Sequence, residues 1–286
     1  MFNLTQSVRK LQRSVNRSWK LYGLSREGNC TAESIAPSVR ATLKGEWTQD
    51  EQSWIDRIER LRSEMNASSA PLTRTDFGAG NPEFNCTPEQ MRAGVETADT
   101  LGHISRVASK PPFWCALLFE LVRTVRPTSC IEMGTSVGIS AAYQGAALTL
   151  NGGGGLVTLE GASSVANIAR KNLRELGLDT VDVVVGRFED TLPKVLATSQ
   201  PVDYVFVDGH HEERATIGYF EQIMPFLAEM ALVVFDDIAW SDGMRRAWNR
   251  IARSEGVEVA VDLGPLGLCV INRRAAGQKY FRIPMN

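Results

Sequence analysis

Carboxylate side chains stand at or near the ends of four short apolar runs in the second half of the chain. They are Glu132, Glu160, Asp208 and the adjacent pair Asp236 and Asp237. Two of the three histidines in the sequence, His210 and His211, follow Asp208 within three residues. Carboxylates that follow an apolar strand are costly unless a cation or hydrogen-bond donors compensate their charge. This pattern predicts a site that handles positive charge.

The first of these runs leads into a glycine-containing turn. The turn has the form Glu132-x-Gly134-x-x-x-Gly138 and also contains Thr135, Ser136 and, just beyond it, Ser140. Its glycines let the backbone approach a ligand closely, and the predicted helix that follows offers free amides. The turn lacks the GxGxxG spacing of dinucleotide-binding proteins, and its acid would repel a pyrophosphate. The turn therefore suits an amino group or a sulfonium, although glycines at such a turn can also serve structure alone.

The next two strand ends carry residues suited to a nucleoside. Glu160, which is followed by Gly161, stands where an acid accepts hydrogen bonds from the ribose hydroxyls in such folds. An acid here can instead stabilise the dipole of the next helix. Arg187 and Phe188 follow the third run, where they could border an adenine, and Phe188 could equally fill the core.

The last three carboxylates form a set that suits a divalent metal ion. Asp208, Asp236 and Asp237 offer oxygen ligands from neighbouring strand ends, and Mg²⁺ prefers such ligands. The alternative is that Asp236 or Asp237 caps the following helix and that Asp208 binds local backbone. His211 is suited to accept a proton at neutral pH, because histidine has an ordinary pKa of about 6.5. His210 beside it leaves the choice of base open.

Alternating strands and helices position these residues. The predicted strands are 130–133, 156–160, 181–185, 204–208, 232–236, 257–261 and 268–271. The predicted helices are 113–125, 137–150, 165–176, 189–196, 212–227 and 243–254. This alternation predicts a doubly wound, parallel α/β sheet. The last two strands are joined only by residues 262–267, too few for a crossover helix, so this pair should be antiparallel.

The first 110 residues have a different pattern. Apolar residues at helical spacing from Leu4 to Trp19 predict an amphipathic helix, packed on the body or on a second subunit, with an acidic partner or anionic lipid as the alternative. Helices are also predicted over 47–65, with Thr48 as N-cap, and over 89–108, and loops over 67–71 and 78–82. Lys110 precedes two prolines and marks a boundary. We therefore predict a helical N-terminal extension over 1–110, as a substrate lid or dimer arm, and a catalytic domain over 111–286.

Composition excludes several classes of protein. The 31 Lys+Arg and 33 Asp+Glu give a net charge of −2, which offers no electrostatic case for nucleic-acid binding. No run of about 18 apolar residues predicts a membrane span. The first 20 residues lack the apolar core of a secretory signal, although their basic composition is compatible with a transit peptide. The five cysteines form no CxxC pair, so we expect neither a zinc site nor a disulfide framework, and we expect a cytoplasmic location.

Taken in order, these motifs over residues 128–272 resemble a class I S-adenosyl-L-methionine-dependent methyltransferase. The chain is most similar to the metal-dependent O-methyltransferases of bacterial secondary metabolism, such as the macrocin-type sugar enzymes. Its Asp236-Asp237 pair agrees with that branch, whereas catechol and caffeoyl relatives often have Asp-Asn. The stretch from Gly186 to Pro193 is also similar. The resemblance implies a seven-stranded, Rossmann-like sheet with its last strand antiparallel, S-adenosyl-L-methionine as cofactor, Mg²⁺ as a second cofactor and a homodimer as one oligomeric state.

The resemblance also implies roles for the individual residues. Glu132 would approach the methionine amino group or nearby backbone, and Glu160 would hold the ribose. The other implied cofactor contacts are Gly134, Thr135, Ser136, Gly138, Ser140, Gly161, Arg187, Phe188 and Asp208. The implied metal ligands are Asp208, Asp236 and Asp237. His211 matches the position of the general base, and the added His210 blurs that assignment.

The expected reaction is methyl transfer to a hydroxyl of a small molecule, in which Mg²⁺ would bind a diol, catechol or α-hydroxy carbonyl. A second hypothesis is a metal-independent N- or carboxyl-methyltransferase that acts on a peptide or metabolite. A third is a cofactor-binding partner protein without catalysis. A nicotinamide dehydrogenase is disfavoured because GxGxxG is absent. Trp240 is a candidate for the substrate wall, whereas Trp248 is expected in the core and His103 at the surface.

Overall fold

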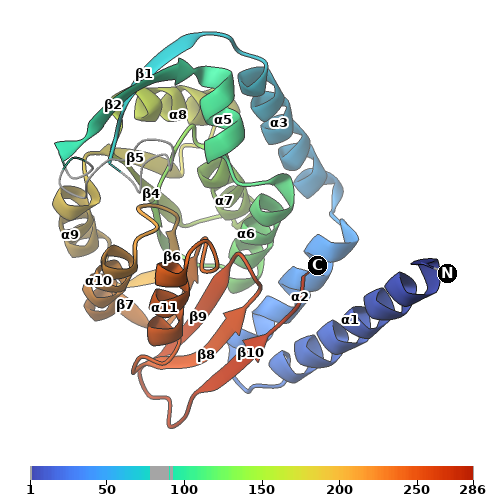
Figure 1. Ribbon diagram of the computed structural model, residues 1–286. Coiled ribbons are helices and arrows are strands. Elements are labelled where there is room, and N and C mark those ends of the chain that lie inside the picture. Colours follow the sequence, from blue (N-terminus) through green and yellow to red (C-terminus); the bar gives the residue numbers. More distant parts are fainter. Residues whose placement is uncertain (1, 78–89, 91–92, 286) are drawn as a thin grey trace.

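The seven predicted apolar runs form neighbouring strands of one sheet. The computed structural model describes the backbone of residues 2–77, 90 and 93–285, with side chains from residue 12 onward. Its main sheet has the order β10-β8-β9-β7-β6-β3-β4-β5 (Figure 1). The strands are β3 (Ser129–Met133), β4 (Gly155–Glu160), β5 (Val181–Val185), β6 (Val202–Val207), β7 (Leu227–Phe235), β8 (Val257–Asp262), β9 (Gly267–Asn272) and β10 (Lys279–Arg282).

The sheet confirms the predicted doubly wound topology. From β3 the chain proceeds outward through β4 and β5 on one side, then crosses to β6 and β7 on the other, and all of these neighbours are parallel. β9 inserts between β7 and β8 and is antiparallel to both, as its short connection to β8 predicts. β10 adds an eighth strand, parallel to β8, that the sequence analysis did not predict. The winding direction reverses between β3 and β6, which is where such sheets bind ligands.

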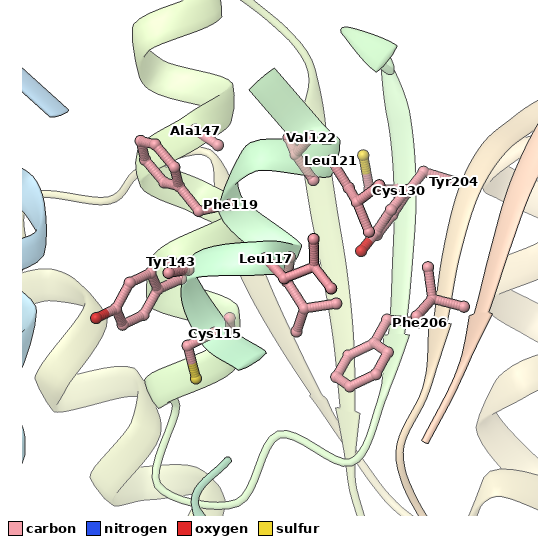
Figure 2. Close-up of a cluster of buried hydrophobic side chains, with 14 of the residues drawn as sticks. Cys115, Leu117, Phe119, Leu121, Val122, Cys130, Tyr143, Ala147, Tyr204 and Phe206 are labelled. Carbon is pink, nitrogen blue, oxygen red and sulfur yellow. The ribbon is translucent and has the colours of Figure 1, made fainter. Parts of the chain in front are cut away.

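Helices cover both faces of the sheet. The helices that pack on one face are α6 (Pro112–Val125), α7 (Ile139–Asn151) and α8 (Ser163–Leu176). The helices that pack on the other face are α9 (Phe188–Ser199), α10 (Glu213–Ile223, followed by the short 3₁₀ helix Met224–Phe226) and α11 (Asp242–Ile251). Residues 204–207 of β6 alternate between the two buried clusters, because side chains alternate across a strand. Figure 2 shows Leu117 and Leu121 of α6 against Tyr204 and Phe206 of β6. Trp248 of α11 is 1% exposed, which confirms it as a core residue.

The N-terminal part packs on the α6–α8 face. It comprises α1 (Phe2–Leu24), α2 (Cys30–Lys44), α3 (Gln49–Asn66), β1 (Pro71–Asp76), β2 (Val95–Thr100) and α5 (Leu101–Ala108). The N-cap prediction is confirmed, since Thr48 and Glu51 form a reciprocal capping box on α3. Leu24, Ile35 and Ile58 belong to the same buried cluster as α6 and α7. The division of the chain at residue 110 stays a prediction.

The predicted helix over 89–108 is wrong in part, because Val95–Thr100 forms a strand. This segment pairs antiparallel with Pro71–Asp76, whereas Leu101–Ala108 is helical, as are the described residues 90 and 93. Alternating exposure and pairing with a distant segment outweigh the local helical pattern. The predicted loop over 78–82 and Cys86 lie outside the described residues. Across the described part of the chain, no helix combines the length and hydrophobicity needed to cross a bilayer.

Candidate active site

A cavity of about 600 Å³ opens where the carboxyl ends of β3, β4, β6 and β7 meet. Its wall includes Gly134, Glu160, Asp208 and Asp236, each of which follows or ends one of these strands. The N-terminal part closes another side, through residues 74–77 at the end of β1 and residues 106–111 before α6. The cavity therefore lies at the reversal point of the sheet and draws on both parts of the chain.

The turn after β3 is shaped to approach the next strand end closely. Gly134 has φ +106°, and a Cβ at this position would lie 1.9 Å from the carbonyl oxygen of Asp208. The amide of Ser136 donates to Glu160 Oε2 at 2.9 Å, which joins the ends of β3 and β4. The Ser136 hydroxyl is buried and has no hydrogen-bond partner among the described residues. A buried, unpartnered hydroxyl beside a cavity is expected to bind a ligand or water.

Glu160 lines the cavity with its carboxylate held in a fixed position. Oε1 accepts a hydrogen bond from the amide of Ala162 and Oε2 accepts one from Ser136, both at 2.9 Å. Burial raises the pKa of Glu160, and these two amide hydrogen bonds oppose that shift. Each oxygen keeps a further lone pair for a donor in the cavity. Gly161 also lines the cavity, where its Cα faces the ring of Phe77.

Other predicted cofactor residues lie beneath the cavity and do not line it. Glu132 is fully buried and accepts hydrogen bonds from Gln144 Nε2 at 2.8 Å and Thr158 Oγ1 at 2.6 Å. Burial raises the pKa of Glu132 to about 7, against the effect of these donors. The Thr135 hydroxyl is 2.6 Å from that of Thr158. These residues form a buried network that supports the turn from below.

Gly138 and Ser140 also belong to this supporting layer. Gly138 has φ +89° at the N-cap of α7 and packs closely on Ala169 of α8. Ser140 is buried in the first turn of α7 beside Glu132. Their described contacts are structural, and neither residue lines the cavity.

The residues after β5 and β6 form an aromatic side of the cavity. Phe188 lines it and meets Tyr219 edge-to-face, with the ring centroids 5.8 Å apart. Gly209 leaves room for Phe188, because a Cβ there would lie 2.8 Å from its ring. Arg187 lines the rim and pairs with Asp190 at 2.8 Å. This side presents aromatic surface to the same cavity that Glu160 lines.

Asp208, Asp236 and Asp237 come together at the other end of the cavity, and a lysine joins them. The ammonium of Lys110 contacts Asp236 directly and lies 3.9 Å from Asp237 Oδ1. Asp236 is 1% exposed, and burial together with Asp208 raises its pKa well above the ordinary value. Burial lowers the pKa of Lys110, but attraction by Asp208, Asp236 and Asp237 outweighs it, so the net shift is upward. The three carboxyl groups of Asp208, Asp236 and Asp237 are called the acidic cluster below.

His211 lies within reach of the acidic cluster, and His210 does not. His211 Nε2 is 3.6 Å from Asp208 Oδ1 and 3.9 Å from Asp237 Oδ2. The ring of Trp240 packs edge-on to that of His211, with centroids 5.1 Å apart. Burial lowers the pKa of His211, and the nearby aspartates oppose this shift. The Nδ1 atom of His210 instead lies 2.8 Å from the hydroxyl of Tyr219.

The acidic cluster and His211 offer ligand atoms suited to a metal ion, but Lys110 is a competing cation. Asp208, His211 and Asp236 each present one ligand atom, and these atoms lie within 4.8 Å of one another. Carboxylate oxygens are the type of ligand that Mg²⁺ prefers, although Asp237 is not in this group. An ion bound to Asp236 would have to lie about 2 Å from its oxygen. The Lys110 ammonium is already in contact with that carboxylate, so the arrangement described does not fit a divalent ion.

Most cavity residues at the strand ends are predicted from the sequence, but several residues of the cavity wall are not. Lys110 was noted only as a boundary residue, although three adjacent carboxylates require a nearby cation. Phe77, Tyr219 and Arg74 were not singled out, and all three line the cavity. Trp240 was proposed as a wall residue, and it lines the cavity. His103 is half exposed and pairs with Asp99 at 3.5 Å, away from the cavity.

Comparisons with known proteins point to one family. Residues 131–238 match the family described as a methyltransferase domain. Protein-L-isoaspartate O-methyltransferase 2 of Archaeoglobus fulgidus is 27% identical over 186 residues, which are 64% of this chain and 78% of that protein. The O-methyltransferase TomG of Streptomyces achromogenes, solved with SAM, is 26% identical with a TM-score of 0.50, covering 58% of this chain and 82% of that chain. The O-methyltransferase of Bacillus cereus, solved with SAH, shares the fold with a TM-score of 0.52 at 24% identity, covering 58% and 84%. The family match runs from β3 to the residues after β7, which build most of the cavity.

Proposed function

We propose that this chain, a class I S-adenosylmethionine-dependent methyltransferase, methylates a hydroxyl oxygen of a small molecule. One observation carries the proposal. A single cavity contains both the turn and acid suited to a nucleoside cofactor, Gly134 and Glu160, and an acceptor end with the partly buried His211 among aspartates. The cofactor supplies the reactive methyl group, so the chain has to position the acceptor and remove its proton.

At the cofactor end, three side chains are proposed to contact the nucleoside. The Glu160 carboxylate accepts hydrogen bonds from the ribose hydroxyls through its free lone pairs. Phe188 borders the adenine, and the Ser136 hydroxyl, which has no partner in the described structure, donates to the cofactor. Glu132 acts indirectly, by holding the turn through Thr158 and Gln144.

The acceptor end is assigned to His211. The neutral imidazole takes the proton of the acceptor hydroxyl, and a lone pair of that oxygen attacks the methyl carbon. The carbon–sulfur bond breaks, and its electron pair returns to the sulfur, leaving S-adenosylhomocysteine, a methyl ether and an imidazolium. Burial supports this role because it lowers the pKa of His211 and so favours its neutral form at neutral pH. Asp208 and Asp237, within 4 Å of Nε2, stabilise the imidazolium once it forms.

A carboxyl acceptor on a peptide is the second candidate. The similarity to a protein-L-isoaspartate O-methyltransferase favours it. The chemistry of the site opposes it, because a carboxylate has no proton for His211 to remove, and Asp208 and Asp237 beside His211 would repel it. A hydroxyl acceptor meets neither objection, so it remains our first choice.

The N-terminal part is proposed to act as a lid over the acceptor. Arg74 and Phe77, at the end of β1, line the cavity, and Ser164 of α8 donates to the Thr73 carbonyl at 2.7 Å. These contacts support a role in acceptor selection, whereas the homodimer and the cytoplasmic location stay predictions. Mg²⁺ assistance also stays a prediction, and the position of Lys110 argues against it.

The test is a parallel assay of S-adenosylhomocysteine release with a panel of acceptors. The panel contains catechols, sugars and isolated alcohols on one side and an isoaspartyl peptide on the other. We expect turnover with at least one hydroxyl compound and none with the peptide. Turnover with the peptide alone would replace the proposal with the carboxyl alternative.

A further inference from the structure

An ammonium group stands where the acidic cluster would otherwise hold a divalent ion. We propose that Lys110 is the resident cation of this site: it takes the place of the metal and donates a hydrogen bond to the acceptor oxygen, so methyl transfer needs no added metal. Only the hydrogen bond to the acceptor rests on the proposed function. The occupation of the acidic cluster by Lys110 can be tested without any acceptor.

The ammonium of Lys110 lies against two of the three carboxyl groups of the acidic cluster. Lys110 contacts Asp236, which is almost fully buried, and lies 3.9 Å from Asp237. The side chain of Asp236 also lies within hydrogen-bonding distance of that of Asp208, so the ammonium stands between closely spaced carboxyl groups. A divalent ion bound at its usual distance from Asp236 Oδ2, the oxygen that the ammonium contacts, would overlap the ammonium. Lys110 and a metal ion therefore compete for one position.

The backbone holds Lys110 at this position. Its carbonyl accepts a hydrogen bond from Arg62 Nη1 at 2.7 Å, and Arg62 is itself buried on α3. Pro111 follows in an extended conformation, and Pro112 begins α6. Proline fixes the backbone at 111 and restricts it at 110. The lysine thus extends from a rigid segment, as expected for a built-in charge.

The side chain is placed to serve the reaction as well as the fold. Lys110 lines the cavity together with His211, and its side chain is only 14% exposed. An ammonium has three donors, so after contacting Asp236 it retains donors for an acceptor oxygen. With His211 it would hold a hydroxyl between a proton acceptor and a positive charge.

This arrangement changes the expected class of acceptor. A metal ion binds a diol or catechol through two oxygens, whereas an ammonium can hold a single oxygen. An isolated hydroxyl is then sufficient. We expect that removal of the neighbouring hydroxyl from an accepted diol lowers kcat/KM by less than tenfold.

The first test uses the wild-type protein and Mn²⁺ as the probe. Free Mn²⁺ is followed by electron paramagnetic resonance during titration of the protein, and turnover is measured with EDTA and with added Mg²⁺. We expect no Mn²⁺ site tighter than millimolar and less than a twofold effect of EDTA. Tight binding of one Mn²⁺, or loss of turnover in EDTA that Mg²⁺ restores, would overturn the proposal. The titration needs no acceptor, so a failed search for acceptors leaves its result valid.

The second test uses Lys110→Met, which keeps the length of the side chain and removes its charge. We expect at least tenfold tighter Mn²⁺ binding than in wild type and about a 10²-fold loss of kcat, the usual cost of removing one donor to a charged oxygen. Lys110→Arg should retain resistance to EDTA. Lys171→Met is the control, because its ammonium lies 3.6 Å from Glu175 on the exposed surface of α8. Equal Mn²⁺ affinity in wild type and Lys110→Met would contradict the proposal, and if Lys110→Met fails to fold, the wild-type titration still decides.

Discussion

Substitution of Gly134 by alanine should separate the two strand ends that build the cofactor end of the cavity. The new Cβ would lie 1.9 Å from the Asp208 carbonyl oxygen, whereas real Cβ atoms essentially never approach within 3.0 Å, so the backbone must move by about 1 Å. The positive φ of this residue adds about 1–2 kcal/mol of strain, and overpacking adds about 1–3 kcal/mol. We therefore expect a loss of roughly 2–5 kcal/mol in unfolding free energy. A displacement of this size in an active site costs about 10²-fold, which we expect in S-adenosylhomocysteine affinity.

The matched control is Gly177→Ala at the end of α8. Gly177 has φ +72°, but a Cβ there meets nothing within 4 Å, so only the strain of about 1–2 kcal/mol applies. Chemical denaturation gives the two stabilities, and calorimetry with S-adenosylhomocysteine gives the two affinities. Gly177→Ala should bind like wild type. If Gly134→Ala binds the ligand like the control and is equally stable, the close approach of Gly134 to Asp208 is not what shapes the site.

Two further predictions concern titratable side chains. His211→Asn should lower kcat by about 10²–10⁴-fold and leave the Kd for S-adenosylhomocysteine within twofold. His210→Asn should lower kcat much less, and a larger loss of kcat in His210→Asn than in His211→Asn would assign the base to His210. Because burial lowers the pKa of His211, the acid limb of the wild-type kcat profile should have its midpoint below pH 6.5. Burial on α6 and the nearby Glu51 raise the pKa of Glu120 to about 7. The folded state therefore binds this proton more tightly than the unfolded state does, and stability is lost as pH rises from about 4.5 to 7. The unfolding free energy of Glu120→Gln relative to wild type should therefore rise by about 2 kcal/mol from pH 5 to pH 8, as measured by urea denaturation. A stability difference that does not change with pH would refute this prediction.

The sequence predicted the sheet well because its strands are continuous apolar runs. β3 to β9 were all located, and the antiparallel last pair followed from the short connection between β8 and β9. The β1–β2 ribbon was missed because it depends on pairing between Asp76 and Val95, which local helical spacing does not report. β10 is short and largely exposed, so its sequence carries no apolar run.

The residues of the candidate site that directly follow a strand could be predicted from the sequence. Residues that follow β3, β4, β6 and β7 meet at one edge because parallel strands bring their carboxyl ends together. Lys110 could not be placed, because its contact with Asp236 spans more than a hundred residues and depends on how α6 packs on the sheet. Glu132 was expected at the ligand, but it points into the core, where Gln144 and Thr158 satisfy it. The sequence pattern does not reveal whether a residue near the end of a buried strand, such as Glu132, points toward the ligand or into the core.

Calorimetric titration of S-adenosylhomocysteine into the wild-type protein and Glu160→Gln tests the central claim most directly. Glu160 lines the cavity with both oxygens fixed by backbone amides, so it is prepared to accept hydrogen bonds from a ribose. We predict one site in the wild type and a loss of about 10–100-fold in Glu160→Gln, as expected for a hydrogen bond to a charged group. The absence of any binding heat in the folded wild-type protein would contradict the account.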